Sequence, residues 1–335
     1  MAITTLTDLI NAGLTLDSAA ALAPVTDQFR LRISAEMAQT TEGVARQFVP
    51  TLNELLIRAE ELVDPIGDRV HEPTEGLTHR YPDRVILHAT QTCEVYCRFC
   101  FRRETVGATG HLPEAALQKA IDYIAATPAV WEVILTGGDP MTLSPRRLTS
   151  LIDRLAAIPH VEVIRFHTRV PVVAPDRITD ALIGALKTRP AVYVVVHSNH
   201  PAELTQAACA ALARLANAGI PLLSQSVLLK GVNDDAAVLE ALFRTLTRNR
   251  VKPYYLHHAD LAKGTSHFRT TIAEGQALMA TLRGRLSGIC LPTYVMDIPG
   301  GYGKVPIGPN YLSAQSMDYL VEDPNGNRHA YNDLT

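Results

Sequence analysis

Short apolar segments alternate with helical segments along most of this chain, and this alternation constrains the fold more than any other feature. Seven runs rich in Val, Ile, Leu and Tyr lie between residues 84 and 296, and stretches with helical periodicity separate nearly all of them. Parallel strands joined by right-handed crossover helices produce this pattern. Six or more such units fit a full or partial barrel better than an open sheet, so we predict an α/β fold, a partial (β/α)6-type TIM-like barrel. The predicted strands are 84–90, 132–136, 161–166, 192–196, 221–227, 252–256 and 291–296, and the predicted helices are 114–126, 146–157, 179–187, 202–218, 236–249 and 273–286.

The segments that flank the repeat have different patterns. Residues 1 to about 70 show helical periodicity, for example over 52–62, and no strand pattern. A loop containing Pro and Gly leads from them into the repeat. We therefore predict an N-terminal helical region at 1–75, the barrel at 76–312 and a C-terminal tail at 313–335.

Polar residues and glycines follow the predicted strands almost one for one. Because function collects at the carboxyl ends of barrel strands, this placement predicts an active site at one end of the barrel. In chain order the segments are a cysteine loop, Gly137–Asp139, His167–Arg169, His197–His200, Gln225 at the end of the fifth strand, and His257, His258 and Asp260 after the sixth.

Three of the five cysteines, Cys93, Cys97 and Cys100, lie within eight residues. Thiolates select soft metals, and iron–sulfur clusters are normally held by cysteines. Three thiolates on a 4Fe–4S cluster leave one iron open, which creates a place to bind and reduce a ligand. A zinc site that borrows a distant histidine is the main alternative.

The composition limits the cellular compartment in which we expect this protein and the kinds of partner that it can bind. The net charge of −3, from 31 basic and 34 acidic residues, gives no argument for nucleic acid or an anionic membrane as partner. There is no basic-then-apolar leader and no apolar run of membrane-spanning length. The odd number of clustered cysteines argues against a disulfide framework. We therefore expect a cytoplasmic protein.

Several motifs together resemble a known family. The spacing of the three cysteines, followed by Gly137-Gly138-Asp139, resembles the radical S-adenosylmethionine (SAM) superfamily. Within it, the region from about Val44 to Leu312 resembles the lysine 2,3-aminomutase family, through the strings at 77–84, 100–103, 225–234, 253–255, 267–269 and 299–304. The resemblance implies that residues 76–312 form a radical SAM barrel that also holds a pyridoxal phosphate site.

The resemblance implies three cofactors: a 4Fe–4S cluster, SAM and pyridoxal 5′-phosphate. The residues that match the family's motifs are Cys93, Cys97 and Cys100 for the cluster, Gly137, Gly138, Asp139, His197 and Gln225 for SAM, Arg80, Tyr81 and Arg84 for the phosphate of pyridoxal phosphate, and Lys304 for the Schiff base to it. Without the family, Gly137–Pro140 is an ordinary turn, His197 a core histidine and Lys304 a solvated lysine.

The substrate residues implied by the resemblance are one arginine and two acids. Arg102 corresponds to the family's clamp on the substrate α-carboxylate, and Asp260 and Asp297 correspond to the carboxylates that receive the distal ammonium of lysine. Two converging carboxylates suit a basic substrate, because a buried ammonium needs paired charge, and they would repel the side chain of glutamate. Turn capping by the two aspartates is the alternative.

The predicted activity is that of an isomerase that converts L-lysine to β-lysine (3,6-diaminohexanoate) by 2,3-migration of the amino group. A 5′-deoxyadenosyl radical would remove a hydrogen from the β-carbon and return it afterwards. Alternatives are β-lysine production for the modification of elongation factor P, an arginine or glutamate 2,3-aminomutase and, much less favoured, a non-catalytic zinc-binding scaffold. Expected partners are the amino acid substrate, a reducing electron donor such as flavodoxin or ferredoxin, and further copies of the chain in a homo-oligomer.

Two departures from the family pattern bear on these predictions. The best-known lysine mutases carry C-terminal cysteines for a structural zinc site, whereas Asp235 occupies one matching position here and no cysteine follows Cys290. The subunit arrangement that this zinc supports is therefore open. His257 and His258 replace the residues expected after Tyr255, and we interpret both as part of the pocket wall.

Overall fold

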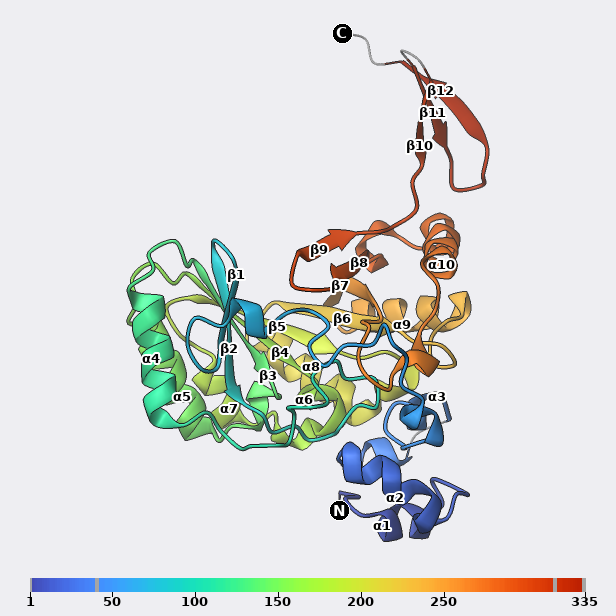
Figure 1. Cartoon of the computed structure of the whole chain (residues 1–335). Coiled ribbons are helices and arrows are strands. Elements are labelled where there is room, and N and C mark those ends of the chain that lie inside the picture. Colours follow the sequence, from blue (N-terminus) through green and yellow to red (C-terminus); the bar gives the residue numbers. More distant parts are fainter. Residues whose placement is uncertain (1, 40–41, 316–317, 333–335) are drawn as a thin grey trace.

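A curved nine-stranded sheet forms the centre of the computed structural model, which describes residues 2–39, 42–315 and 318–332 (Figure 1). The strands follow one another in chain order from one edge of the sheet to the other. The two edge strands, β1 (Leu77–Tyr81) and β9 (Gly303–Pro306), pair antiparallel with their neighbours. The seven strands between them are parallel: β2 (Arg84–Thr90), β3 (Glu132–Gly137), β4 (Val163–Thr168), β5 (Ala191–His197), β6 (Leu222–Leu228), β7 (Val251–His258) and β8 (Thr293–Ile298).

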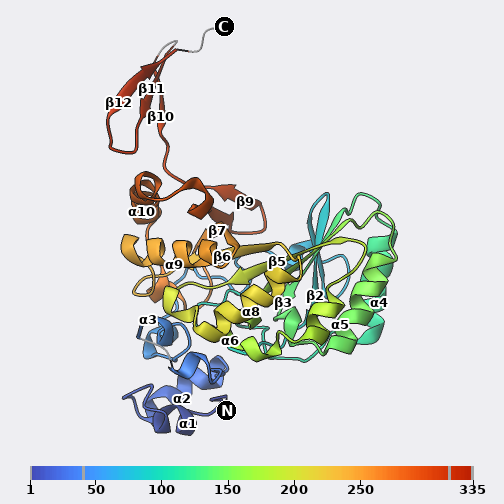
Figure 2. The same ribbon diagram turned by 180° about the vertical axis from the view of Figure 1, so that it is seen from behind.

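The helices between the parallel strands cover the outer face of the sheet, as Figures 1 and 2 show from opposite sides. One of them illustrates why: Ser144 caps a helix whose apolar residues Leu148, Leu151, Ile152 and Leu155 recur at helical spacing and are all buried. The predicted partial barrel is confirmed, since six helix-containing crossovers connect the seven parallel strands. These helices are α4 (Glu114–Ala125), α5 (Pro145–Ala156), α6 (Val170–Val173), α7 (Asp180–Ala185), α8 (Gln206–Asn217), α9 (Ala236–Arg248) and α10 (Ile272–Arg285).

The N-terminal region consists of short helices. They are α1 (Leu6–Asn11), α2 (Ala19–Gln28), α3 (Glu42–Ala45) and the 3₁₀ turns η1 (Met37–Gln39), η2 (Leu52–Leu55) and η3 (Arg69–His71). The helix predicted over 52–62 is wrong beyond Leu55. Leu56 has an extended backbone, the Glu54 carboxylate binds arginines of the cysteine loop, and the Leu62 N–H donates to the Leu261 carbonyl at 2.7 Å. Tertiary contacts thus override the local helical periodicity.

Five strands were not predicted. β1 and β9 are short edge strands next to Pro and Gly turns. The other three, β10 (Leu312–Gln315), β11 (Asp318–Glu322) and β12 (Arg328–Tyr331), form a separate antiparallel sheet that extends away from the barrel in Figures 1 and 2. All of β12 is exposed, so this segment lacks the hydrophobic alternation that reveals a half-buried strand. The proposed division at residues 75 and 312 stays a prediction.

Among the residues that the structure describes, no helix combines the length and the apolar character needed to cross a membrane.

Candidate active site

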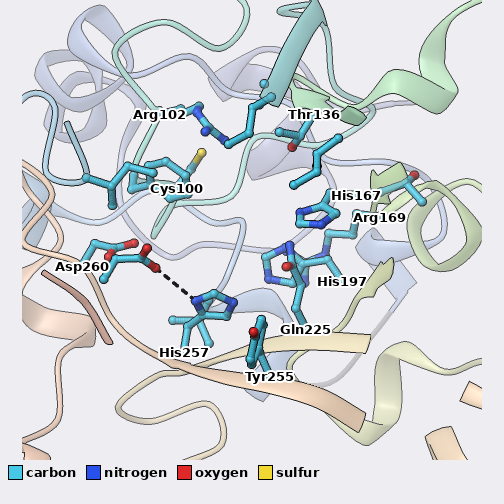
Figure 3. Close-up of a pocket in the computed structure, with 18 of the residues that line it drawn as sticks. Cys100, Arg102, Thr136, His167, Arg169, His197, Gln225, Tyr255, His257 and Asp260 are labelled. Carbon is cyan, nitrogen blue, oxygen red and sulfur yellow. Dashed lines mark ion pairs between the residues drawn. The ribbon is translucent and has the colours of Figure 1, made fainter. Parts of the chain in front are cut away.

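A cavity of about 700 Å³ runs along the parallel strands, from first residues such as Arg84, Glu132 and Thr293 to the loops at their carboxyl ends, and it brings every predicted site residue together (Figure 3). Figure 3 shows Arg102, Cys100 and Asp260 on the left of the view and His167, Arg169 and His197 on the right, with His257 and Tyr255 below. The predicted residues in its wall are Arg80, Tyr81, Arg84, Cys93, Cys97, Cys100, Arg102, Gly137, Gly138, Asp139, His197, Gln225, Asp260, Asp297 and Lys304.

Two predicted positions need correction. Gln225 lies in the middle of β6, which continues to Leu228, and it reaches the cavity because alternate residues of that strand face it. His258 is not part of the cavity wall. It lies on the opposite face of β7 from His257, and its Nδ1 is 2.8 Å from the Tyr294 hydroxyl.

The three cysteines lie on the loop between β2 and α4. Burial raises the pKa of the Cys100 thiol to about 11 and also raises the pKa of Cys93 and Cys97. Buried thiols of this kind ionise when a metal centre supplies positive charge. Among the described residues, no three Cys, His, Asp or Glu side chains converge on one ion position. The cysteines of a 4Fe–4S cluster differ from such a set because each binds a different iron.

A buried ionic cluster anchors the cysteine loop to the N-terminal region. The carboxylate of Glu54 is 0% exposed and accepts hydrogen bonds from Arg98 Nη2 at 2.6 Å and from Arg103. Arg98 also donates to the Arg30 carbonyl at 2.9 Å, and the Arg103 guanidinium stacks on the Phe29 ring at 3.5 Å. Residues of the N-terminal region, which lie far from the cysteine loop in the sequence, therefore fix the position of this loop.

The Gly137-Gly138-Asp139 turn is shaped by the protein's own atoms. A Cβ at Gly137 would lie 2.7 Å from the His88 ring, and one at Gly138 would lie 2.6 Å from the backbone of residues 91–92. The Asp139 carboxylate accepts hydrogen bonds from Thr168 Oγ1 at 2.7 Å and from the Arg169 N–H at 2.6 Å. The structure thus supplies packing reasons for these residues, and their role toward SAM stays a prediction.

Lys304 belongs to strand β9, directly after a glycine-rich turn. Its register partner across the hairpin is Asp297 on β8, so both side chains extend from the same face. The Lys304 ammonium forms an ion pair with the Asp297 carboxylate, and its Nζ lies 3.2 Å from Nδ1 of His257. The Tyr81 hydroxyl accepts from the Lys304 backbone N–H at 2.8 Å. The glycines at 300, 301 and 303, all with positive φ, form the turn before the lysine.

The two predicted acids differ in their ionisation. Burial and the neighbouring Asp297 carboxylate raise the pKa of Asp260 to about 7. Burial would also raise the pKa of Asp297, but the hydrogen bond to His257 and the Lys304 ammonium hold it below its usual range. Burial and Lys304 lower the pKa of His257, which leaves its imidazole neutral at pH 7. The pair of acids therefore carries less than two full negative charges near neutral pH.

Arg102 has a partner that the sequence did not reveal. Its guanidinium binds the Asp68 carboxylate through Nε and Nη2, both at 2.8 Å. Burial would raise the pKa of Asp68, but the Arg102 charge lowers it. Asp68 lies in a Pro-Ile-Gly-Asp segment that predicts only a loop.

The three residues predicted to bind phosphate are arranged differently from one another. Arg84 stacks over the Tyr81 ring, with its Cζ 3.8 Å from the ring centroid. Arg80 instead donates to the Ile66 carbonyl, and its guanidinium lies 3.4 Å from Asp68 and 3.9 Å from Asp297. Arg80 is therefore already paired within the protein, and its role toward phosphate stays a prediction, as do those of Tyr81 and Arg84.

Three histidines in the cavity wall present buried ring nitrogens that have no hydrogen-bond partner among the described residues. They are His167, His197 and His257, each through Nε2. Burial lowers the pKa of His167 and His197 well below the usual range, so their rings stay neutral. Buried polar atoms are nearly always hydrogen-bonded, so these nitrogens fit a wall that receives a polar ligand. His167 was noted only as part of a strand-end motif and was not predicted as a site residue.

Comparison with known proteins identifies the class of protein to which this chain belongs. The model of the Radical SAM superfamily matches residues 87–242, and the model described as Lysine-2,3-aminomutase matches residues 279–325. A solved radical SAM methyltransferase from Sphaerobacter thermophilus is 19% identical, with a TM-score of 0.46, over 66% of this chain and 68% of that one. The Radical SAM model covers β2 to α9 of the barrel, and the Lysine-2,3-aminomutase model covers the hairpin that carries Lys304. The chain is a radical SAM protein.

Similarity to whole proteins narrows the class. An L-lysine 2,3-aminomutase from Clostridium subterminale is 46% identical over 84% of this chain and 68% of that protein. A glutamate 2,3-aminomutase from Clostridioides difficile is 42% identical over 82% of this chain and 65% of its own length. The chain thus spans about two thirds of the length of these relatives. It belongs to the lysine 2,3-aminomutase family, whose members named here are isomerases.

Proposed function

We propose that this protein is an L-lysine 2,3-aminomutase, which moves the α-amino group of lysine to the β-carbon and releases β-lysine. The observation that carries the proposal is one cavity that holds two chemically different sides. We call them the cysteine side (Cys93, Cys97, Cys100 and Arg169) and the lysine side (Lys304, Asp297, Asp260 and His257). Relatives named as lysine 2,3-aminomutases at 42–46% identity support the same activity.

The residues present fit the three cofactors of the family. Buried thiols on the cysteine side fit a 4Fe–4S cluster, unpartnered histidine nitrogens and Gln225 fit a polar nucleoside, and Lys304 beside Tyr81 and Arg84 fits pyridoxal phosphate. When bound, these groups supply a carbon-centred radical and a carrier for the migrating nitrogen, chemistry that no amino-acid side chain provides. The protein supplies binding, orientation and exclusion of water.

Two ion pairs in the cavity occupy the positions proposed for the charged ends of the substrate. Arg102 holds the Asp68 carboxylate, and a substrate α-carboxylate can take that place on the guanidinium fork. Asp297 holds the Lys304 ammonium, and the distal ammonium of lysine can take that place. Each exchange keeps the Arg102 guanidinium and the Asp297 carboxylate paired, and the displaced Asp68 keeps Arg80 as a partner at 3.4 Å.

Lys304 must lose a proton before its nitrogen can form a covalent bond. The neutral imidazole of His257, with Nδ1 at 3.2 Å from Nζ, is placed to accept that proton. Asp297 also contacts this ring, at 3.5 Å from Nδ1, and stabilises the imidazolium that results. The dashed line at His257 in Figure 3 marks this contact.

The acids of the lysine side favour a basic substrate. Asp297 is held in its ionised form, and an incoming ammonium would also favour ionisation of Asp260. The side chain of glutamate would meet both carboxylates at close range. Arginine stays a second candidate, because a guanidinium also binds two carboxylates well.

The physiological setting follows from the same proposal. We propose a cytoplasmic enzyme, since buried thiols and a cluster require a reducing compartment, with flavodoxin or ferredoxin as the electron donor and a homo-oligomeric assembly. The β-lysine would serve metabolism or the modification of elongation factor P.

An anaerobic assay tests the substrate directly. The reconstituted protein, with SAM and dithionite, is incubated separately with lysine, arginine, glutamate and alanine, and β-amino acids are detected by mass spectrometry. We expect turnover of lysine above all others. Turnover of glutamate without lysine would overturn the proposal, and turnover of arginine alone would select the second candidate.

A further inference from the structure

Behind the cysteine side lies a buried hydrogen-bond network that the proposed reaction does not use directly. Arg169 Nη1 donates to the sulfur of Cys97 at 2.8 Å. On its other side, Arg169 Nη2 donates to Glu203 at 2.6 Å and to Gln47 at 2.7 Å. Gln47 and Glu203 are fully buried, and Arg169 is only 5% exposed. A permanent positive charge is therefore held against one predicted cluster ligand, away from solvent.

The position of Arg169 is fixed from several directions. Its backbone N–H donates to Asp139 at 2.6 Å, and its guanidinium lies over the Phe48 ring at 4.7 Å. Glu203 itself is fixed, because its carboxylate also accepts from Gln47 Nε2 at 2.8 Å and from the Asn199 N–H at 2.9 Å. Both Nη atoms of Arg169 and both carboxylate oxygens of Glu203 are hydrogen-bonded, and a network with so many bonds permits little rearrangement.

Gln47 links this network to the cysteine loop. Its backbone carbonyl accepts from the Arg98 N–H at 2.8 Å, one residue after Cys97. The N-terminal region thus contributes to the network through a side chain and to the loop through its backbone. The distance from Arg169 to Cys97 is consequently set by three separate parts of the chain.

We propose that Arg169 and Glu203 together set the reduction potential of the cluster held by the three cysteines, with Arg169 raising it and Glu203 moderating that effect. The inference rests on the proposed function, because it requires a cluster at these cysteines. Reduction adds one negative charge to the cluster, so a nearby positive charge and a hydrogen bond to a ligand sulfur favour the reduced state. The buried Glu203 carboxylate on the far side of Arg169 disfavours the reduced state, because its negative charge repels the added electron. The low polarity of the protein interior strengthens the effects of both charges.

The test is a redox titration of the whole chain after anaerobic reconstitution, without SAM, monitored by electron paramagnetic resonance. In Arg169→Gln the ratio of reduced to oxidised cluster at a fixed potential should fall about tenfold, the effect of a 59 mV shift for one electron. In Glu203→Gln, which keeps the shape and a hydrogen-bond acceptor, that ratio should rise. Arg169→Lys keeps the charge and should stay closer to the wild type than Arg169→Gln.

The control is Arg154→Gln, which removes a surface arginine paired with Glu114 on the outer helices and should leave the potential unchanged. Unchanged potentials in Arg169→Gln and Glu203→Gln, or shifts of both in the same direction, would overturn the inference. If the Arg169→Gln protein takes up no cluster, the Glu203→Gln variant decides the test by itself. In that case, a ratio of reduced to oxidised cluster that does not rise in Glu203→Gln overturns the inference. A wild-type protein that takes up no cluster would instead refute the proposed function.

Discussion

The two sides of the cavity differ in how their charges are paired. On the cysteine side, Arg98, Arg103 and Arg169 bind Glu54 and Glu203, and all five side chains are at most 7% exposed. None of these partners is proposed to bind substrate. Two other pairs are proposed to open when substrate arrives: Arg102 with Asp68, at the end of the cysteine loop, and Lys304 with Asp297, on the lysine side. The pairs that support the cysteine loop are built to stay fixed, and the two pairs proposed to meet the substrate are built to exchange partners.

The origin of the two sides in the chain explains the difference. The acids and amides behind the cysteine loop come from the N-terminal region and from the segment after β5, so distant parts of the chain fix it. The lysine side consists of neighbouring strands β7, β8 and β9, and its key pair spans a single hairpin. A lysine on an edge strand can leave its partner with little disturbance of the core.

The largest effect is expected for Lys304→Ala, which should abolish turnover because no other described lysine lines the cavity. The absorption band of the covalent pyridoxal phosphate linkage should vanish, while iron content stays at the wild-type level because the cysteine side shares no contact with Lys304. Lys187→Ala, at an exposed residue two positions after α7, is the control and should retain both signals. Loss of iron together with the band would contradict the independence of the two sides.

The next largest effect concerns the fixed side. Glu54→Ala leaves Arg98 and Arg103 buried without their anion and should lower the free energy of unfolding by about 3–5 kcal/mol. Urea unfolding followed by circular dichroism measures it. The matched control, Glu114→Ala, breaks an exposed pair and should cost less than about 1 kcal/mol. Equal losses in the two variants would refute the role of burial.

Asp297→Asn tests the exchangeable side. It removes the charge proposed to receive the substrate ammonium and should raise the KM for lysine about 30-fold, which corresponds to roughly 2 kcal/mol. Asp176→Asn, an exposed acid outside the cavity, should leave KM unchanged. A normal KM for lysine in Asp297→Asn would exclude this contact.

The pH dependence of lysine binding follows from Asp260. Its pKa of about 7 means that the carboxyl is neutral below that pH and charged above it, so kcat/KM for lysine should fall as the pH drops below 7. The fall should be at most about tenfold per pH unit, since one proton is involved. In Asp260→Asn this step should disappear from the profile, and its persistence would assign it to another group.

The smallest effect is expected for Tyr81→Phe. This change removes the hydroxyl that accepts from the Lys304 backbone and should cost about 1 kcal/mol of hydrogen-bond energy. The expected result is a small loss in pyridoxal phosphate affinity, measured by titration of its absorbance. Tyr302→Phe, at an 81% exposed residue of the same hairpin, should have no effect.

The sequence predicts the barrel well because each parallel strand is a short β-branched run between amphipathic helices. It also predicts part of the cavity wall, since motifs such as Cys93–Cys100 and Gly137–Asp139 are local and follow strands, and the family resemblance adds Arg80 and Lys304. It does not predict Glu54, Asp68 or Glu203, because isolated acids carry no pattern and the arginines that bind them, Arg98, Arg102 and Arg169, lie 34 or more residues away. The same reason explains the error at 52–62, where Glu54 turns inward.

The placement of single side chains on the lysine side also exceeds what the sequence can show. Glycines before Lys304 predict a loop, yet the hairpin register places the lysine on a strand opposite Asp297. The separation of His257 from its neighbour His258 depends on which face of β7 turns inward, and that is settled only by packing.

The central claim is that the two sides act in one reaction on lysine, and isotope transfer tests it most directly. Lysine carrying deuterium on its β-carbon is incubated anaerobically with the reconstituted protein, dithionite and SAM. The account predicts β-lysine as product and deuterium in the 5′-carbon of the recovered SAM. Formation of β-lysine with no deuterium in SAM would contradict it.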